Sequence, residues 1–191
     1  MREICSEGLQ QGKYLFTEEW EGNISTLSQE SLINEIEIMK HFDHPNVLKL
    51  FEVFETENSL YIIIDYLEGG PFTSKIKKAG KVPEPLLLKY IMYILLGVFH
   101  IHEKGVMHRD LKPDNIIFRR EKGDEIVLVD FGLASFVNVD EYIFSRCGTP
   151  GYVAPEIANM KDPKGKYGSV CDLFSIGVIM HFMFPFLLIP G

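Results

Sequence analysis

The sequence contains little cysteine, and its cysteines are far apart. Among 191 residues, cysteine occurs only at Cys5, Cys147 and Cys171. This spacing predicts neither a disulfide framework nor a zinc site. Unpaired cysteines are typical of reducing compartments, so we expect the protein in the cytoplasm, with the nucleus as the alternative.

An excess of positive charge is also absent. The chain has 27 acidic and 19 basic residues, which give a formal net charge of −8 at pH 7. This balance argues against a nucleic-acid-binding surface but is compatible with basic peptides as substrates. We therefore expect no nucleic acid among the partners.

Long hydrophobic runs that could enter a membrane are lacking as well. The first seven residues do not contain the apolar core of a signal peptide. The most apolar stretch, residues 174–190, is just short of a membrane span, and Pro185 interrupts it. We expect a buried helix in the first half of this stretch, and no membrane partner.

Apolar residues are nevertheless plentiful. The chain is 46% hydrophobic and 12% aromatic, so it is expected to be globular and not disordered. A length of 191 residues fits one domain, or a large part of a bigger one, and is sufficient to bury a core.

Two short apolar runs between polar turns dominate the middle of the chain. They lie at residues 116–118 and 126–129, with a charged segment at 119–125 between them. This pattern predicts a β-hairpin. A hairpin brings its outer ends together, so we expect the polar residues before the first strand to face Asp130, which follows the second.

The polar residues at these ends have a consistent chemistry. Asp110, Lys112 and Asn115 precede the hairpin, and Asp130 follows it. Carboxylate and amide oxygens suit Mg²⁺, and an ammonium group suits phosphoryl oxygens. The pattern therefore indicates a site for a metal ion together with a phosphate group.

Three motifs in this region resemble those of eukaryotic serine/threonine protein kinases. They read H-R-D-L-K-P-D-N at 108–115, D-F-G at 130–132 and A-P-E at 154–156. Three such motifs in the right order are a specific signal. The resemblance is greatest to the calcium/calmodulin-dependent protein kinase group, and it covers about residues 30–183.

The resemblance implies an α+β, bilobal protein-kinase-like fold that is truncated at both ends. We expect a partial β-rich N-lobe over residues 29–67 and a partial helical C-lobe over residues 68–191, which ends at the F-helix. Residues 1–28 stay unassigned, because no alternating run stands out among them.

The same resemblance implies the roles of the catalytic residues and names ATP and Mg²⁺ as cofactors. Asp110 would accept the proton of a substrate hydroxyl or orient that hydroxyl, and Lys112 would stabilise charge on the γ-phosphoryl group. Asn115 and Asp130 would hold Mg²⁺. Thr149 would help to orient a serine or threonine hydroxyl of a protein substrate.

A second set of positions is implied for the nucleotide. Ile64 matches the gatekeeper, and the backbone of Asp65 and Leu67 would hydrogen-bond adenine. Ile117 would contribute to the same site. Glu35 matches the C-helix glutamate, which pairs with a phosphate-binding lysine.

Two parts of the family pattern are missing from the sequence. Neither a G-x-G-x-x-G turn nor a V-A-I-K strand occurs before residue 40, and Lys13 is the one lysine there. We interpret Lys13 as a solvated loop lysine, and we expect weak activity or none from this chain. Two alternatives therefore stay open beside an active kinase, namely a pseudokinase-like binding module and a non-functional fragment.

Residues 133–153 resemble an activation segment. Ser145 matches the usual phosphosite for an upstream kinase, and Arg109 is the charge that a phosphorylated segment usually engages. Asp140 and Glu141 offer fixed negative charge nearby. Constitutive ordering of the segment is therefore the alternative to phosphorylation.

Apolar spacing predicts helices at residues 29–41 and 84–103 and strands at 47–54 and 60–66. The resemblance implies a further helix at 170–183, the F-helix, whose Asp172 would hydrogen-bond the backbone of the catalytic loop. Ser28 or Ser31 is expected to cap the first helix, and Gly105 to end the second. His100 and His102, at i and i+2, are expected to lie on different helix faces rather than to form a metal pair.

The last predicted helix should be incompletely covered. In a kinase it lies at the centre of the helical lobe, and the helices that cover it are not in this sequence. We expect Glu156 to lack its arginine partner. Five apolar residues are not expected to be buried together, namely Ile176, Val178, Ile179, Phe182 and Phe186.

Overall fold

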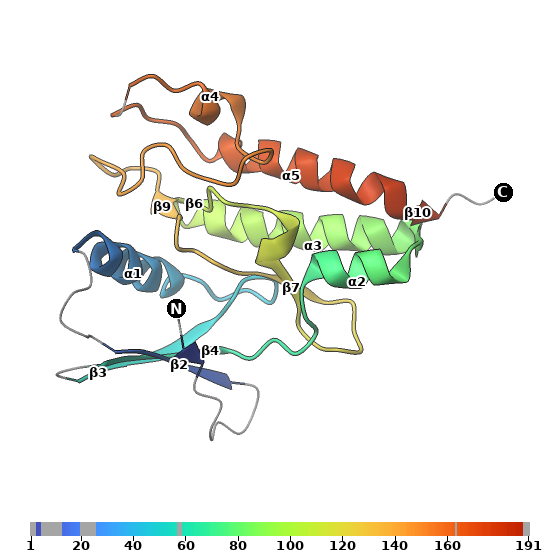
Figure 1. Ribbon diagram of the computed structural model, residues 1–191, viewed down its shortest axis with the longest axis horizontal. Helices are drawn as coiled ribbons and strands as arrows, with labels where there is room; N and C mark the ends of the chain where they lie inside the picture. Colours follow the sequence, from blue (N-terminus) through green and yellow to red (C-terminus); the bar gives the residue numbers. More distant parts are fainter. Residues whose placement is uncertain (1–2, 5–12, 20–25, 57–58, 163, 189–191) are drawn as a thin grey trace.

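The computed structural model describes residues 3–4, 13–19, 26–56, 59–162 and 164–188 (Figure 1). A β-sheet with one helix forms one part, and a stack of helices with three two-stranded ribbons forms the other. Cys5 and the last three residues, which the sequence analysis discussed, lie outside the described residues.

The sheet is antiparallel and has four strands in the order β1-β2-β4-β3. Its strands are β1 (Glu3–Ile4), β2 (Lys13–Glu19), β3 (Leu50–Glu55) and β4 (Ser59–Asp65). Helix α1 (Thr26–Met39) packs on it through Leu32 and Ile36, which form a small core with Leu60 and Ile62. This packing places one face of α1 over the sheet.

Two expectations for the N-terminal region are wrong. Lys13 is not in a loop, because β2 pairs with β4 at every residue from Lys13↔Asp65 to Glu19↔Ser59. The paired residues of the two strands lie 40 to 52 positions apart, so no local pattern reveals the pairing. Helix α1 begins at Thr26, so Ser31 lies inside the helix and does not cap it.

The helical part contains α2 (Phe72–Ala79), α3 (Glu84–Glu103), α4 (Pro155–Ala158) and α5 (Val170–Met183). The bounds of α3 and α5 agree with the sequence prediction, whereas α2 was not predicted. Gly105 ends α3 with a φ of +70°, and its N–H donates to the carbonyl of His102 at 2.9 Å. Glycine adopts this left-handed conformation without strain.

Short strands and 3₁₀ turns connect these helices. The ribbons are β6 (Val106–Met107) with β9 (Ser135–Phe136), β7 (Ile116–Phe118) with β8 (Ile126–Leu128), and β5 (Val82–Pro83) with β10 (Leu187–Leu188). The 3₁₀ turns are η1 (Pro113–Asn115) and η2 (Phe184–Phe186). The β7–β8 pair confirms the predicted hairpin.

Helix α3 is the central support of the helical part. One face, which includes Leu87, Ile94, Val98 and Ile101, is buried in the main core. At Gly97 the helix approaches β8 closely, because a Cβ there would lie 2.9 Å from Leu128 Cδ1. By length and composition α3 could also cross a bilayer, and its core packing accounts for the apolar residues of this buried face.

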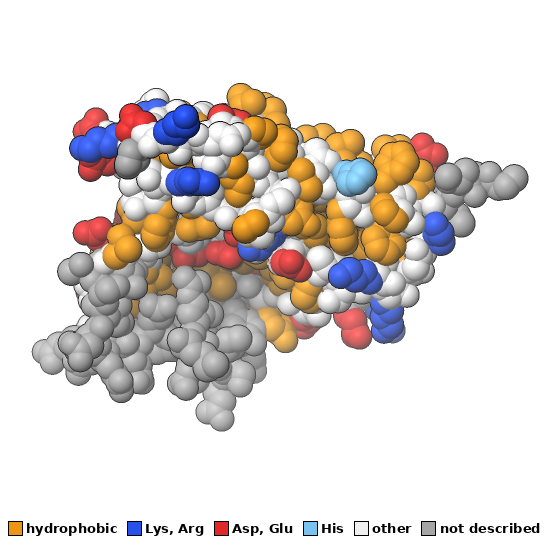
Figure 2. Space-filling view, turned by 45° about the horizontal axis from the view of Figure 1, so that its top comes forward, with side chains coloured by type: hydrophobic (Ala, Val, Ile, Leu, Met, Phe, Trp, Pro, Cys, Tyr) orange, Lys and Arg blue, Asp and Glu red, His pale blue; other side chains and the backbone are white. Residues whose placement is uncertain are grey.

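The other face of α3 and part of α5 expose apolar side chains. Ile176 and Ile179 are buried, whereas Val178, Phe182 and Phe186 are only half-buried. The exposed large side chains are Leu88, Met92, Leu95, Leu96 and Phe99 on α3 and Val170, Leu173, Phe174 and Met180 on α5. Figure 2 shows hydrophobic side chains spread over this side of the molecule. Strand β10 pairs with β5, which directly precedes the start of α3.

The close approach at Gly97 gives a stability prediction. Gly97→Ala should lower the free energy of unfolding by about 1 kcal/mol or more, because the added methyl would also lie 3.0 Å from the carbonyl of Asn46. Gly177→Ala in α5 is the matched control. Its Cβ meets nothing, so the better helix propensity should raise stability by about 0.5–1 kcal/mol. Denaturant unfolding measures both, and a stabilised Gly97→Ala variant would contradict the packing.

The exposed apolar face predicts self-association. Phe99→Gln with Leu173→Gln should reduce it, because these side chains are 62% and 50% exposed and add little to the core. Sedimentation velocity over a concentration series measures the change. Glu103→Gln, an exposed substitution at the end of α3, serves as the control. A parent chain that stays monomeric throughout would show that these side chains do not drive association.

Candidate active site

A buried carboxylate fixes the loop that carries the predicted catalytic residues. Asp172 on α5 is 0% exposed and accepts the backbone N–H groups of His108 at 2.9 Å and Arg109 at 2.8 Å. Its Oδ2 also lies 2.8 Å from Nε2 of His102. The predicted contact of α5 with the catalytic loop is therefore present. The role of His102 was missed, because its spacing to His100 was tested only as a metal pair.

Arg109 has a left-handed backbone with a φ of +66°. This conformation is strained for a residue with a side chain, so the surrounding bonds must hold it. The N–H bond to Asp172 does so, and it sets the direction in which the next residue, Asp110, projects.

Asp110 is surrounded by donors. Lys112 Nζ lies 2.8 Å from its Oδ2, and the hydroxyl and backbone N–H of Thr149 donate to Oδ1 at 2.6 and 2.8 Å. Lys112 Nζ also donates to Thr149 Oγ1 at 2.8 Å. The structure thus brings together three of the predicted catalytic residues, one of them from a segment 39 positions away.

These contacts set the charge of Asp110. Burial opposes ionisation of the carboxyl group, but the hydrogen bonds from Lys112 and Thr149 outweigh it, and the pKa lies below its ordinary value. Asp110 is therefore an anion at neutral pH, and its two oxygens accept hydrogen bonds from the Lys112 ammonium and the Thr149 hydroxyl.

Asn115 completes this cluster. Its Nδ2 donates to the carbonyl of Asp110 at 2.9 Å and to Asp110 Oδ2 at 3.2 Å. Because the amide nitrogen is committed to Asp110, the side-chain oxygen is left to face a ligand. The turn η1 places Asn115 directly before β7, as the motif predicted.

Asp130 lies across the open end of the hairpin from Asn115. The N–H of Val129 donates to the carbonyl of Asn115 at 3.0 Å, and the next residue, Asp130, has a φ of +66°. An amide oxygen and a carboxylate suit Mg²⁺, which takes one or two protein oxygens and completes its shell with phosphate oxygens and water. The residues present therefore fit a Mg²⁺–nucleotide pair.

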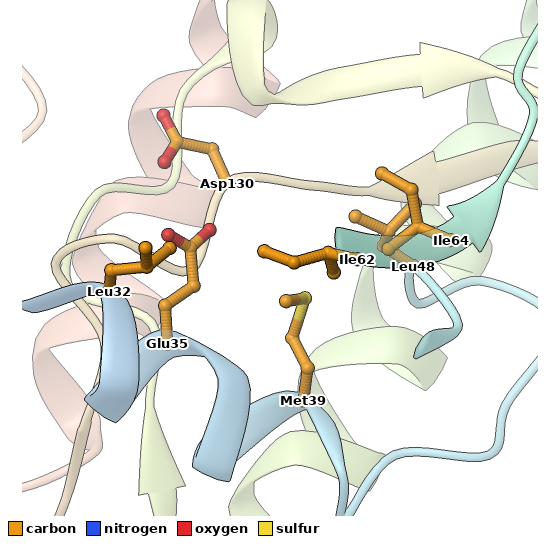
Figure 3. Close-up of a pocket in the computed structure, with 7 residues that line it drawn as sticks. All are labelled: Leu32, Glu35, Met39, Leu48, Ile62, Ile64 and Asp130. Carbon is orange, nitrogen blue, oxygen red and sulfur yellow. The ribbon is translucent and has the colours of Figure 1, made fainter. Parts of the chain in front are cut away.

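A cavity of about 340 Å³ opens beside Asp130 (Figure 3). Glu35 reaches into it from α1 and is only 6% exposed, while Ile64 and Ile62 border it from β4. Its remaining lining residues are Leu32, Met39 and Leu48. Glu35, Ile64 and Asp130 thus line one and the same cavity.

Two polar side chains on α1 connect the cavity to the segment after Asp130. Ser31 Oγ donates to the carbonyl of Gly132 at 3.1 Å, and Asn34 Nδ2 donates to that of Ala134 at 3.0 Å. Sequence reasoning missed both. Ser31 lies three residues before Asn34 and four before Glu35, and these i, i+3 and i, i+4 spacings on one side of the helix are the signal that could have found them.

The remaining predicted nucleotide positions lie along the exit from β4. The N–H of Asp65 already donates to the carbonyl of Lys49 at 3.0 Å, so only its carbonyl is left for adenine. Leu67 is half-buried against the core, and Ile117 is half-buried in β7. In the register of β2 and β4, the backbone of Lys13 lies opposite Asp65. Ile62, which lines the cavity together with Glu35, lies opposite Phe16. Lys13 is therefore three positions along β2 from the residue that lies opposite this part of the cavity.

The acidic residues of the activation segment are not partners of Arg109. Glu141 pairs with Lys164 at 2.7 Å, and Asp140 is exposed. Ser145 is half-buried and borders a cavity of about 210 Å³ together with Lys164 and Lys166. Glu156 is exposed and makes no ion pair with a residue that the structure describes.

Comparison with known proteins finds a family match that includes all the residues of this site. The family described as the protein kinase domain matches residues 16–187. A protein of Dictyostelium discoideum named probable myosin light chain kinase is 40% identical over 169 residues, which are 86% of this chain and 53% of that protein.

Two further relatives have the same character. The human serine/threonine-protein kinase DCLK3 is 41% identical over 152 residues, 78% of this chain and 22% of that protein. Calcium-dependent protein kinase 5 of Plasmodium falciparum is 41% identical over 155 residues, 81% of this chain and 26% of that protein. The chain thus spans about half the length, or less, of these curated relatives.

The hydrogen bonds of Asp110 predict a measurable titration. Thr149→Val should raise the pKa of Asp110, because it removes a donor that favours the charged carboxylate while the backbone donor stays. A depressed folded pKa contributes stability above the unfolded value, and this stability is lost as pH falls through the folded pKa. Thr149→Val should therefore show a shallower fall in stability below about pH 4.

Carboxyl carbon NMR titration measures the pKa directly. Thr73→Val is the matched control, because Thr73 donates to Asp114 Oδ1 at 3.0 Å on the exposed surface. That variant should leave Asp110 unchanged. An unaltered Asp110 titration in Thr149→Val would show that the hydroxyl does not stabilise the carboxylate.

Proposed function

The chain belongs to the protein kinase family, and on that basis we propose that it transfers the γ-phosphoryl group of ATP to serine or threonine hydroxyls of proteins. The observation that carries this proposal is the Asp110 carboxylate, which Lys112 and Thr149 hold in its charged form. A carboxylate in this setting can take the proton of an attacking hydroxyl.

The chemistry assigns one step to each residue. The substrate oxygen attacks the γ-phosphorus of ATP. The bond between the γ-phosphorus and the oxygen that bridges it to the β-phosphate breaks, and ADP leaves. The hydroxyl proton goes to Asp110, and Lys112 stabilises the negative charge on the transferred group. Mg²⁺, held by Asn115 and Asp130, would neutralise charge on the phosphate oxygens.

The preference for serine or threonine rests on Lys112 and Thr149. Both lie within hydrogen-bond distance of Asp110 and of each other, so they narrow the space from which a hydroxyl can approach. The sequence Cys-Gly-Thr-Pro-Gly-Tyr around Thr149 is of the serine/threonine type by resemblance, and one relative is named a serine/threonine-protein kinase.

The assay uses the chain with ATP, Mg²⁺ and a basic peptide that carries one serine. We expect phosphoryl transfer, slow because the sequence has no V-A-I-K lysine, and Asp110→Asn should reduce kcat by about 10²–10³-fold. Asp124→Asn at the hairpin tip is the matched control and should leave kcat unchanged. A tyrosine version of the peptide should not be phosphorylated.

Nucleotide binding is measured separately by thermal shift with ATP, with and without Mg²⁺. Stabilisation should require Mg²⁺ and should be lost in Asp130→Asn. Binding without transfer would replace the kinase proposal by that of a nucleotide-binding module. The absence of both in a folded chain would overturn the proposal.

A further inference from the structure

We propose that Tyr142 and Tyr167 are positioning residues that hold the activation segment, residues 133–153, in order while Ser145 carries no phosphate. They act through Arg109, whose side chain they enclose. The effect on catalysis rests on the proposed kinase function, whereas the effect on the order of the segment does not.

Arg109 is a buried cation that is satisfied without a carboxylate. The residue is 4% exposed, and none of the ion pairs between described residues includes its guanidinium. Nε donates to the carbonyl of Leu133 at 2.6 Å, and Nη1 donates to the carbonyl of Phe144 at 2.7 Å and to the hydroxyl of Tyr167 at 2.9 Å. A buried charge needs such partners, because it has lost its water.

Two aromatic rings supply the rest of its environment. The guanidinium carbon lies 4.9 Å from the ring centre of Tyr142 and 5.9 Å from that of Tyr167. The tyrosines also bind each other, since the hydroxyl of Tyr142 donates to the carbonyl of Tyr167 at 2.9 Å. Cation–π attraction is strongest where the cation is desolvated, as it is here.

The contacts of Arg109 join three parts of the chain. Arg109 precedes Asp110 in the catalytic loop, Leu133 and Phe144 lie in the activation segment, and Tyr167 precedes α5. A rigid guanidinium that bonds both other segments fixes their distance from the catalytic loop. Loss of the rings should therefore loosen the activation segment before it affects the helices.

Lysine contacts strengthen the same arrangement. Lys166 Nζ lies 4.6 Å from the ring centre of Tyr142 and donates to the carbonyls of Val139 and Asp140, both at 2.5 Å. Together with the Glu141–Lys164 pair, these bonds attach the activation segment to residues 164–167.

The activation segment also contacts the catalytic loop and Asp110 directly. A Cβ on Gly148, which has a φ of +109°, would lie 2.8 Å from the carbonyl of Arg109, so the segment packs directly on the catalytic loop. The next residue, Thr149, donates both its hydroxyl and its backbone N–H to Asp110. The tyrosines thus position Thr149, and through it the substrate hydroxyl.

This arrangement changes the expectation for Ser145. Arg109 is only 4% exposed and uses three of its five N–H groups within the fold, so little of its guanidinium is accessible to a phosphate on Ser145. Ser145 instead borders the cavity with Lys164 and Lys166. A negative charge at Ser145 should therefore add little to a segment that is already ordered.

The test compares the parent chain, with Ser145 shown by mass spectrometry to be unmodified, with Tyr142→Leu and Tyr167→Phe. Amide hydrogen exchange should be slow at Val137 and Thr149 of the parent, because their N–H groups donate to the carbonyl of Gly105 and to Asp110 Oδ1. It should rise roughly ten-fold in Tyr142→Leu, which loses a ring, and less in Tyr167→Phe, which loses only the hydroxyl. Exchange over α3 should not change.

Tyr61→Phe, which removes a tyrosine hydroxyl from β4, is the matched control and should leave the amides of Val137 and Thr149 protected. Fast exchange of these two amides in the parent would overturn the proposal, as would unchanged exchange in both tyrosine variants. An equal rise over α3 would also overturn it, because it would indicate general destabilisation.

Activity gives an independent readout. If the chain phosphorylates the serine peptide, Tyr142→Leu should lower kcat/KM about ten-fold, and Ser145→Asp in the parent should change it less than two-fold. A ten-fold or greater activation by Ser145→Asp would show that the unmodified segment is not ordered. The hydrogen-exchange result decides the proposal even if no phosphoryl transfer is found.

Discussion

The carboxylate of Asp172 is the constraint on which the rest of the site depends. It is fully buried, and the backbone donors of His108 and Arg109, with His102, supply its hydrogen bonds. A buried carboxylate is stable only with such partners, so the loop must take the one shape that provides them. The left-handed backbone of Arg109 is the result, and the direction of Asp110 follows from it.

Arg109 is held through both its backbone and its side chain. Its backbone is fixed from α5, and its side chain is fixed from the activation segment and from the residues before α5. Asp110 is therefore oriented by bonds that converge from segments distant in the sequence. Such convergence is what positioning catalysis of phosphoryl transfer requires, because the protein contributes geometry and charge rather than covalent chemistry.

Several parts of this arrangement were predictable from sequence, for reasons that are local. Helices α3 and α5 have long apolar patterns, and the β7–β8 hairpin has two apolar runs around a charged turn, so their bounds follow from residue order. Strand β2 was missed because its stability comes from pairing with β4 rather than from its own pattern. Tyr142 and Tyr167 were missed for a similar reason, since each is an ordinary tyrosine until the fold brings their two rings together beside Arg109.

The sequence by itself determined the family, the hairpin and the identity of the catalytic side chains, because these depend on short motifs and on the periods of helix and strand. Only the tertiary structure decided the state of those side chains. The lowered pKa of Asp110 depends on Lys112 and Thr149, and the environment of the Arg109 side chain depends on Tyr167. Hydrogen bonds and desolvation act over a few ångströms in space, and residues 39 or 58 positions apart become neighbours only when the chain is folded.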